Sequence, residues 1–424
     1  MAAADTHRAI LAAWRIELPR LITSLARMLR DVPLAEDLTQ EALLAALESW
    51  PTTGVPERPG AWLMATAKNR ALDHLRRSRM RTRKHDVIAS DMIEEQQAIP
   101  DFDSALDDDI GDEMLRLIFT ACHPLLSREA RAALALRMIC GLTTEEIARA
   151  FLQPPATVAQ RIVRAKRSLS ESGLAYETPH SEELSQRLAS VLEVIYLIFN
   201  EGYTADRGDD WLRPQLCDEA LRLGRVLTAV APNEPEAFGL LALMELNASR
   251  ASARTDADGN PILLLEQNRA LWDQVQIRRG LLALARAQEL GGGRSNYTLQ
   301  AAIIACHARA ATADGTDWSH IAGLYRELAA VAPSPVVELN RAVAIGMAEG
   351  PQAALTMVDR LADEPALKAY HLLPSVRGDL LYRLGRFGEA CAAFEAASAL
   401  ASNTREREML KRRAAEAARA ARLS

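Results

Sequence analysis

Arginine, glutamine and threonine side chains recur along one side of the stretch from Thr143 to Leu169, and these residue types suit DNA recognition. Gln and Arg can form paired hydrogen bonds to purine edges, whereas Thr, Lys and Arg also bind phosphate. The sequence therefore predicts a DNA-reading face. Its candidate members are Thr157, Gln160, Arg161, Arg164 and Arg167.

Two short helices joined by a tight turn would position this face. Thr143 and Glu146 have the spacing of a capping box that starts the first helix, and Pro155 suits the first position of the second. A buried stripe at helical spacing is predicted for Val158, Ile162, Ala165 and Leu169. The alternative is a solvated basic face on an ordinary amphipathic helix. The capped first helix and the Pro-Pro turn favour a helix-turn-helix.

The composition of the whole chain predicts an all-α fold. The chain has 424 residues, of which 49% are hydrophobic and 5% aromatic, and runs rich in β-branched residues are nearly absent. This length suggests two to four domains. The first residues lack a signal-peptide pattern, and no apolar run reaches the ~18 residues of a membrane span. We expect a cytoplasmic protein without a membrane partner.

Charge is unevenly distributed along the first quarter of the chain, although the net charge is only −6. Nine Lys or Arg residues and one acid lie between Arg58 and Lys84, whereas eleven acids and no base lie between Asp86 and Glu113. This indicates a basic surface followed by an acidic linker. The linker could be a soluble spacer, which we favour, or a nucleic-acid mimic that occupies a basic channel.

No catalytic site, metal site or cofactor is predicted. The five cysteines are scattered without a CxxC pair, and only Cys122 beside His123 invites a metal interpretation, which the lack of partner ligands disfavours. A second group contains Asn200, Glu201, Tyr203, Asp206, Asp209 and Asp210. A catalytic or cation-binding loop is conceivable there, but acidic surface loops are commoner.

Helical spacing continues along the first half of the chain. We expect a helix or helix pair over residues 6–30, with Pro19 marking a break, and a loop from Pro51 to Gly60. A helix from Pro33 should bury Leu34, Leu38, Ala42 and Ala45, and one after Gly60 should bury Met64, Ala67, Ala71 and Leu75. The basic tail at 78–84 could follow a phosphate backbone. Two further helices over 113–140 should be broken at His123-Pro124, with a cap at Ser127.

Two stretches resemble known sequence regions. AEDLTQEALLAALESW with PGAWLMATAKNRALDHLRR resembles region 2 of the extracytoplasmic-function (ECF) sigma factors of bacterial RNA polymerase. LRLIFTACHPLLSREARAALALRMICGLTTEEIARAFLQPPATVAQRIVRAKRSL resembles their region 4. The resemblance implies core RNA polymerase and promoter DNA as partners, with the β′ clamp helices and the β flap as the polymerase contacts.

The resemblance also implies roles for individual residues. Polymerase binding falls to Asp37, Gln40 and Glu41. Reading and melting of the −10 element fall to Lys68, Asn69, Arg70, Asp73, Arg76 and Arg77, and the helix-turn-helix face would read the −35 element. The loop at 51–60 matches a stretch that helps hold a flipped base, and its many prolines leave the base preference open. Melting costs about 1.4 kcal/mol per base-pair step, so cations and a base pocket must hold the strand.

The remainder of the chain is expected to be a tetratricopeptide-like helical array, which a subgroup of these sigma factors carries. The best match is Pro374 to Leu400, where Gly385, Ala390 and Ala393 would let two helices pack closely. The predicted organisation is region 2 at 1–86, an acidic linker at 87–112, region 4 at 113–172, a linker at 173–190 and the array at 191–424.

We therefore predict a sigma factor, not an enzyme, with a fused helical domain that regulates it through intramolecular contact with the sigma regions. One alternative is a helix-turn-helix transcriptional regulator with a ligand- or protein-sensing repeat domain. Another is a repeat scaffold whose front half is only a further helical domain. The block from Asp37 to Arg77, which a simple operator binder does not need, favours the sigma factor.

Overall fold

A computed structural model describes residues 2–86, 110–151, 153–172, 181–203, 214–256, 260–401 and 403–423. Over these ranges the chain consists of helices, connecting turns and one isolated bridge between Thr255 and Pro261. The all-α prediction is confirmed. The chain divides into two compact units, Met1–Val194 (unit 1) and Ile195–Ser424 (unit 2), which are described separately.

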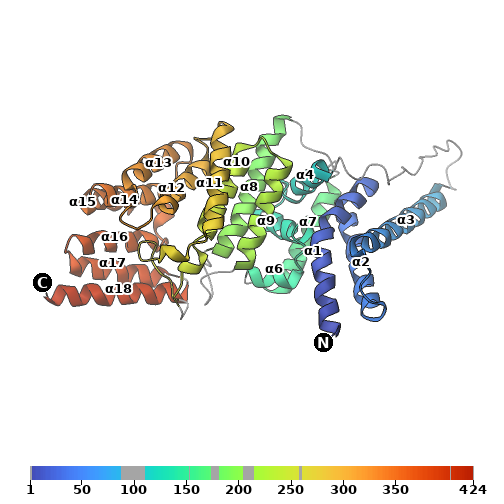
Figure 1. The fold of residues 1–424 in the computed structure, drawn as a ribbon, viewed down its shortest axis with the longest axis horizontal. Helices are drawn as coiled ribbons and strands as arrows, with labels where there is room; N and C mark the ends of the chain where they lie inside the picture. Colours follow the sequence, from blue (N-terminus) through green and yellow to red (C-terminus); the bar gives the residue numbers. More distant parts are fainter. Residues whose placement is uncertain are drawn as a thin grey trace. The chain divides into compact units, whose positions relative to one another are not determined.

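Unit 1 begins with three helices that pack against one another, α1 (Ala2–Leu29), α2 (Val32–Thr53) and α3 (Pro59–Asp86) (Figure 1). The predicted break at Pro19 is wrong, because α1 continues through it. A proline removes one backbone hydrogen bond from a helix interior. Here the fully buried Leu18, Leu21 and Ile22 around it keep the helix in place by packing.

Helix α2 starts where the sequence indicated, since Asp31 caps it by accepting a hydrogen bond from the Leu34 amide at 2.9 Å. Its buried side differs from the predicted stripe. Leu38 and Ala42 are buried as expected, but Leu34 and Ala45 are half-buried. The positions buried instead are Val32, Ala35, Glu36, Thr39, Ala46 and Trp50.

The predicted loop at 51–60 is too long, because α2 includes Pro51 and runs to Thr53, while α3 begins at Pro59. Contacts at both ends explain the short connection. The rings of Trp50 and Trp62 meet edge to face with centroids 5.3 Å apart. At Gly60 a Cβ atom would lie 2.6 Å from the end of the Glu17 side chain, so a larger residue there would make this glutamate of α1 move aside.

The second part of unit 1 contains α4 (Ile110–Ala121), α5 (Arg128–Met138), α6 (Thr144–Ala150) and α7 (Pro155–Glu171). The interruption between α4 and α5 is confirmed, as is the cap at Ser127, which accepts from the Ala130 amide at 3.3 Å. Helix α5 packs on α4, α6 and α7, while α1 contacts α4 and α5 and α2 contacts α7. The two parts of unit 1 therefore touch each other.

Most of the first predicted linker and the first part of the second lie outside the described residues, which omit 87–109 and 173–180. Helix α8 (Ser181–Tyr203), however, begins inside the second one, so the linker prediction is wrong for 181–190. Packing on α4 and α5 accounts for this: Ser190 donates to the Cys122 carbonyl at 2.5 Å and accepts from Arg131. Glu193 forms ion pairs with Arg128 at 2.9 Å and Arg131 at 3.2 Å.

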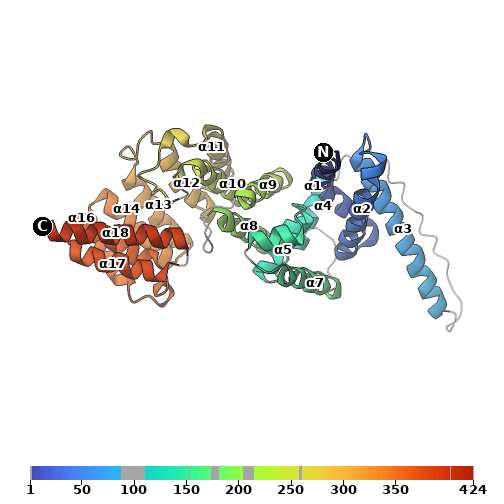
Figure 2. The ribbon, with the colours of Figure 1, turned by 90° about the horizontal axis from the view of Figure 1, so that it is seen from below.

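Unit 2 is a succession of helices in which neighbours along the chain pack together (Figures 1 and 2). Three short 3-10 helices connect them, η1 (Ala251–Ala253), η2 (Arg269–Leu271) and η3 (Pro365–Leu367). After α8 the α-helices are α9 (Pro214–Val230), α10 (Pro235–Ala248), α11 (Gln274–Glu289), α12 (Asn296–Arg309), α13 (Trp318–Val331), α14 (Pro335–Ala348), α15 (Pro351–Leu361), α16 (Leu372–Arg383), α17 (Phe387–Leu400) and α18 (Thr404–Leu423).

The pair α16 and α17 occupies the best predicted repeat, and α18 packs beside α17 (Figure 2). Ala390 and Ala393 are buried as expected, but Gly385 forms the turn, with φ +75°. The close approach occurs at Gly378, where a Cβ atom would lie 2.7 Å from the Phe394 ring. The likeness to a tetratricopeptide repeat stays a prediction.

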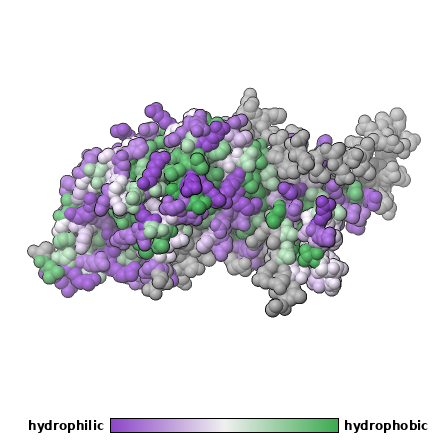
Figure 3. All heavy atoms as spheres, in the orientation of Figure 1, coloured by the Kyte–Doolittle hydropathy of each residue, from purple (hydrophilic) through white to green (hydrophobic). Residues whose placement is uncertain are grey.

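Hydrophilic residues predominate on the face of unit 2 drawn in Figure 3, and hydrophobic residues form a patch near its middle. Helix α11 carries two exposed apolar side chains, with Val275 55% and Leu282 66% exposed. No described helix is both long and apolar enough to cross a membrane.

Candidate nucleic-acid interface

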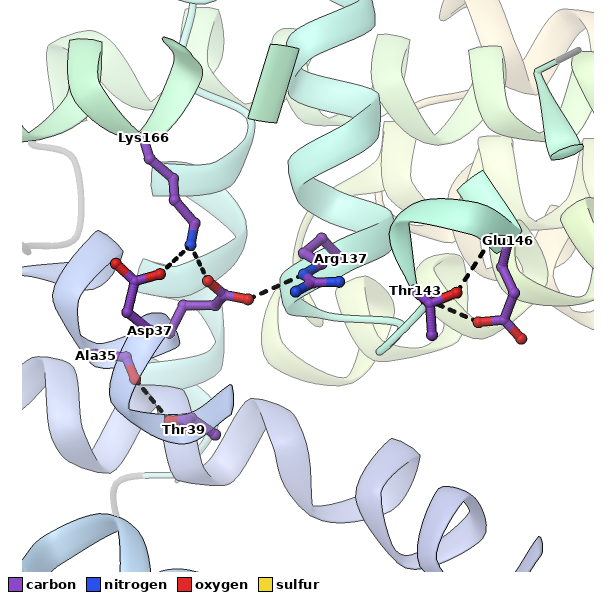
Figure 4. A network of polar contacts seen from close by, with 8 residues as sticks. Ala35, Asp37, Thr39, Arg137, Thr143, Glu146 and Lys166 are labelled. Carbon is purple, nitrogen blue, oxygen red and sulfur yellow. Dashed lines mark hydrogen bonds and ion pairs between the residues drawn. The ribbon is translucent and has the colours of Figure 1, made fainter. Parts of the chain in front are cut away.

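The helix-turn-helix is built by local interactions that match the sequence prediction. The Thr143 amide donates to the Glu146 carboxylate at 2.8 Å, and the Glu146 amide donates to the Thr143 hydroxyl at 3.1 Å (Figure 4). Pro155 is the first residue of α7. The predicted stripe is confirmed, since Val158, Ile162, Ala165 and Leu169 are the buried residues of α7.

The opposite side of α7 presents the side chains predicted to read the −35 element. Thr157, Gln160, Arg164 and Arg167 are exposed, and Arg161 is half-buried. Arg167 forms only a surface ion pair with Glu171, at 2.9 Å, which is weak in water. A largely open polar and cationic face can accept phosphates and base edges without breaking a buried contact.

On α3, the buried side consists of Leu63, Ala67 and Ala71, while the predicted Met64 and Leu75 are half-buried. The residues predicted to contact the −10 element lie on the accessible side: Asn69, Asp73, Arg76 and Arg77 are exposed, and Lys68 and Arg70 are half-buried. Helix α3 extends to Asp86, but its side chains at 78–86 lie outside the described set, as does the predicted phosphate-tracking tail.

Of the predicted polymerase-binding residues, Asp37 and Glu41 are exposed on α2 and Gln40 is half-buried. Glu41 accepts a hydrogen bond from Arg70 at 2.8 Å, so a predicted polymerase contact is paired with a predicted DNA contact. Both side chains are nearly half exposed, at 48% and 41%, so the pair can exchange for other partners at little cost.

A buried carboxylate joins the two parts of unit 1, and the sequence did not indicate it. Glu36 on α2 is fully buried and forms an ion pair with Arg137 of α5 at 3.0 Å and another with Lys166 of α7. Lys166 also binds Asp37 at 2.6 Å (Figure 4). We call Glu36, Asp37, Arg137 and Lys166 the Glu36 cluster. The helix that carries the DNA-reading face thus contacts the helix predicted to bind polymerase.

Cys122 and His123, the pair that invited a metal interpretation, lie between α4 and α5. Burial raises the pKa of the Cys122 thiol to about 12, despite the lowering effect of Arg131 and Arg187, so this thiol stays protonated. His123 accepts a hydrogen bond from the Leu125 amide at 3.0 Å. Among the described side chains no group of three acids, histidines or cysteines could hold a metal ion. Asp206, Asp209 and Asp210 lie outside the described residues.

Three family models match the chain. Residues 14–81 match Sigma-70 region 2, residues 116–169 match Sigma-70 region 4, and residues 187–288 match a family of unknown function, DUF6596. The two sigma matches contain α2, most of α3 and the helix-turn-helix. They define a promoter-recognition subunit of the sigma-70 class.

Relatives narrow the class further. The ECF RNA polymerase sigma factor SigL of Mycobacterium tuberculosis is 31% identical over 166 residues, 39% of this chain and 83% of the relative. The RNA polymerase sigma-H factor of Pseudomonas aeruginosa is 28% identical over 36% of this chain and 80% of its own length. The chain belongs to the ECF sigma factor family, and the sigma-factor prediction is confirmed over its two alternatives.

A further relative extends beyond the sigma regions. An uncharacterized protein of Rhizobium meliloti is 43% identical over 390 residues, which cover 92% of this chain and 91% of the relative. The similarity therefore includes most of unit 2, whose first part matches the family of unknown function.

Proposed function

We propose that the free chain keeps its two promoter-binding regions together through the Glu36 cluster, and that binding of core RNA polymerase at α2 separates them. In this proposal α3 then contacts the −10 element and α7 the −35 element. The supporting observation is the ion pairing of buried Glu36 with Arg137 and Lys166, with Lys166 also bound to Asp37.

Promoter geometry favours such a separation. Elements at −10 and −35 lie about 25 base pairs apart, or roughly 80 Å along a duplex with a rise of about 3.4 Å per pair. Helices α3 and α7 have 28 and 17 residues. At about 1.5 Å per residue they would span less than roughly 70 Å even end to end. Arg70 of α3 binds Glu41 at 2.8 Å and Lys166 of α7 binds Asp37 at 2.6 Å, and these two acids lie one turn apart on α2, so the two DNA faces lie much closer than that.

The same contact links opening to polymerase binding. Lys166 occupies a carboxylate oxygen of Asp37, which the resemblance assigns to the polymerase contact. A cationic polymerase surface would compete with Lys166 for this carboxylate. Once the Lys166–Asp37 pair breaks, Lys166 keeps Glu36 as its partner on α2, so α7 is held to α2 more weakly and can separate from it.

Binding of fluorescently labelled full-length chain to core polymerase without DNA tests this proposal. Lys166→Ala removes a cation that competes for Asp37, so we expect about ten-fold tighter binding, equal to about 1.4 kcal/mol. Lys166→Arg keeps the charge and should bind like the parent chain. Lys368→Ala, which removes an exposed lysine of unit 2, is the control. Unchanged or weaker binding of Lys166→Ala would contradict the proposed opening.

Promoter-specific transcription tests the residue roles. Core enzyme with the parent chain should give a run-off product that depends on both promoter elements. Arg76→Ala should lower initiation by the same factor on promoters altered at the −10 element and on promoters altered at the −35 element. Gln160→Ala should lose discrimination between −35 sequences and keep discrimination between −10 sequences. We assign no catalytic activity to the chain itself. Because it is proposed to bind core RNA polymerase, we also propose a cytoplasmic location.

The proposal also includes regulation of the sigma regions by unit 2. Its support is α8, whose Ser190 and Glu193 bind Arg131 of α5 and whose last residues belong to unit 2. We propose that changes in unit 2 act on region 4 through this helix. Glu193→Gln removes the ion pairs with Arg128 and Arg131 in the full chain. A chain ending at Gly173 lacks α8 altogether. Transcription equal to that of the parent chain from both would remove the regulatory role.

A further inference from the structure

Three arginines of unit 2 gather around two aromatic rings. Arg250 and Arg254 flank η1, and Arg269 begins η2. The Arg254 guanidinium carbon lies 3.7 Å from the centre of the Tyr203 ring, and that of Arg269 lies 4.9 Å from the Trp272 ring. Arg250 lies about as far from both rings, at 6.0 and 5.9 Å. We call Arg250, Arg254 and Arg269 the arginine cluster.

The hydrogen bonds of Arg250 and Arg269 go to neutral oxygens. Arg250 donates to the Tyr203 hydroxyl and to the Asn247 side chain, both at 2.7 Å. Arg269 donates to the carbonyls of His307 and Ala310, both at 2.6 Å, and to the Thr316 hydroxyl at 3.1 Å. Within the described ranges, no carboxylate forms an ion pair with Arg250 or Arg269.

Several polar atoms remain unbonded at the centre of the cluster. The Nε atoms of Arg250 and Arg269, Nε1 of Trp272 and Nδ1 of His307 are all buried without a hydrogen-bond partner. Arg250 is 7% exposed, Trp272 4% and His307 4%. Three of these four atoms are N–H donors in any protonation state, so the cluster has unused donors as well as excess positive charge.

Nearby ionisable groups respond to this charge. Burial, then Arg250 and Arg269, lower the pKa of His307 to about 4. Burial and Arg250 also lower the pKa of Arg269. The His307 ring meets the Trp318 ring edge to face at 5.1 Å, which adds an aromatic wall and no countercharge.

Two other buried or half-buried charges of unit 2 form ion pairs. Glu245 binds Arg225 at 2.7 Å, and Arg413 binds Asp379. An isolated buried cation is costly, and stacking on aromatic rings offsets only part of that cost. Among the residues that the structure describes, the guanidinium groups of Arg250 and Arg269 therefore lack a balancing carboxylate.

We propose that the arginine cluster binds a small oxyanion, the phosphate or carboxylate group of a low-molecular-weight ligand. Arginine suits this role because its planar N–H groups match the oxygens of such groups. Tyr203 and Arg269 are only half-buried, so they form the side from which a ligand enters. The ligand would neutralise Arg250 and Arg269 and accept from the unbonded Nε groups. This site is independent of the function proposed for unit 1.

Anion titrations of the full chain test this inference, with tryptophan fluorescence, to which Trp272 contributes, and thermal unfolding as readouts. Sodium phosphate and sodium succinate are compared with sodium chloride at equal ionic strength. We expect a saturable change with phosphate, succinate or both, and the anion that acts identifies the group that the site takes. No saturable change with either anion would overturn the inference.

Substitutions separate the cluster from general salt effects. Arg269→Gln should weaken anion binding at least about ten-fold, since a hydrogen bond to a charged group is lost. Arg286→Gln, at an exposed α11 arginine paired with Glu289, should leave binding unchanged. Equal binding by both variants would contradict the site. If Arg269→Gln does not fold, Trp272→Phe is the second variant, because it keeps an aromatic ring and removes one N–H donor. We again expect weaker anion binding. Thermal unfolding alone follows binding by this variant.

A further readout does not depend on stability. Burial, and then the charges of Arg250 and Arg269, hold the pKa of His307 near 4. An anion beside the two arginines offsets their part, so that pKa should rise when the site is filled. NMR titration of His307 in phosphate or succinate and in chloride measures it. Identical titration curves in all three salts would contradict the proposal.

Discussion

Unit 1 and unit 2 each bury a cluster of charged groups, but the two clusters are balanced differently. In the Glu36 cluster, two carboxylates face Arg137 and Lys166, and the buried carboxylate has a cation on each oxygen. In the arginine cluster, Arg250 and Arg269 find neutral oxygens and aromatic rings. The first cluster is balanced within the described residues, whereas Arg250 and Arg269 of the second have no carboxylate partner there.

This difference bears on what each cluster can do. A balanced buried cluster specifies one arrangement of the helices that carry it, and it resists opening unless a competitor replaces a partner. An unbalanced one is stabilised by any ligand that supplies the missing charge, in proportion to ligand concentration. The Glu36 cluster therefore suits control by a macromolecular partner, and the arginine cluster suits control by a small anion.

The largest effect is expected from breaking the balance of the Glu36 cluster. Glu36→Ala leaves Arg137 and Lys166 without their buried partner, so the free energy of unfolding of unit 1 should fall by about 3–5 kcal/mol. Urea unfolding followed by tryptophan fluorescence measures it. The control is Asp37→Ala, which affects the same lysine from a side chain 62% exposed, and it should cost less than about 1 kcal/mol. Similar losses in both variants would show that burial of Glu36 does not matter.

The next effect tests the imbalance in unit 2 through pH. His307 has a pKa lowered from 6.5 to about 4, so the unfolded chain binds its proton more readily than the folded chain. Stability from this group is thus present above pH 6.5 and is lost as pH falls towards 4. The full loss is roughly 3 kcal/mol, at about 1.36 kcal/mol per pKa unit.

Urea unfolding of the parent chain and of His307→Gln between pH 7 and pH 4 isolates this contribution, because other acidic groups cancel in the difference. The difference in unfolding free energy between the two chains should shrink as pH falls. A constant difference would mean that His307 is not held neutral by its surroundings.

A smaller effect concerns cations that are unbalanced but exposed. Arg164 on α7 has no ion-pair partner among the described residues, yet water solvates it. Arg164→Ala should therefore change the unfolding free energy by less than about 0.5 kcal/mol while weakening promoter binding by the polymerase complex by about 1–3 kcal/mol. Gel-shift titration on one promoter measures binding, with Ser170→Ala on the same helix as the control. Equal binding by both variants would exclude a DNA contact at Arg164.

The sequence predicted those parts of unit 1 that depend on local patterns. The capping box of Thr143 and Glu146, the start of α7 at Pro155 and its buried stripe follow from spacings of a few residues. The Glu36 cluster could not be predicted this way, because Glu36 lies 101 positions from Arg137 and 130 from Lys166. A glutamate among Asp37, Gln40 and Glu41 reads as one more exposed acid. Tertiary packing likewise overrode the local break expected at Pro19.

Unit 2 was predicted in less detail, because its polar contacts join residues that lie far apart in the sequence. The sequence pointed to Tyr203 only as part of an acidic group, whereas the structure stacks it on Arg254. The arginine cluster draws on residues from Tyr203 to Thr316. These residues become neighbours only when α8, α10, α12 and the 3-10 helices η1 and η2 pack together.

The smallest effect is expected at the exposed pair of Arg70 and Glu41, which is balanced like the Glu36 cluster but lies in water. A double-mutant cycle with Arg70→Ala and Glu41→Ala should give a coupling below about 1 kcal/mol in urea unfolding. The same cycle repeated on core polymerase binding separates the role of Glu41 in stability from its predicted role in binding polymerase. If Glu41 binds polymerase, Arg70→Ala should strengthen binding slightly by freeing that carboxylate. A coupling as large as that between Glu36 and Arg137 would mean that charge balance, and not burial, sets the strength of these pairs.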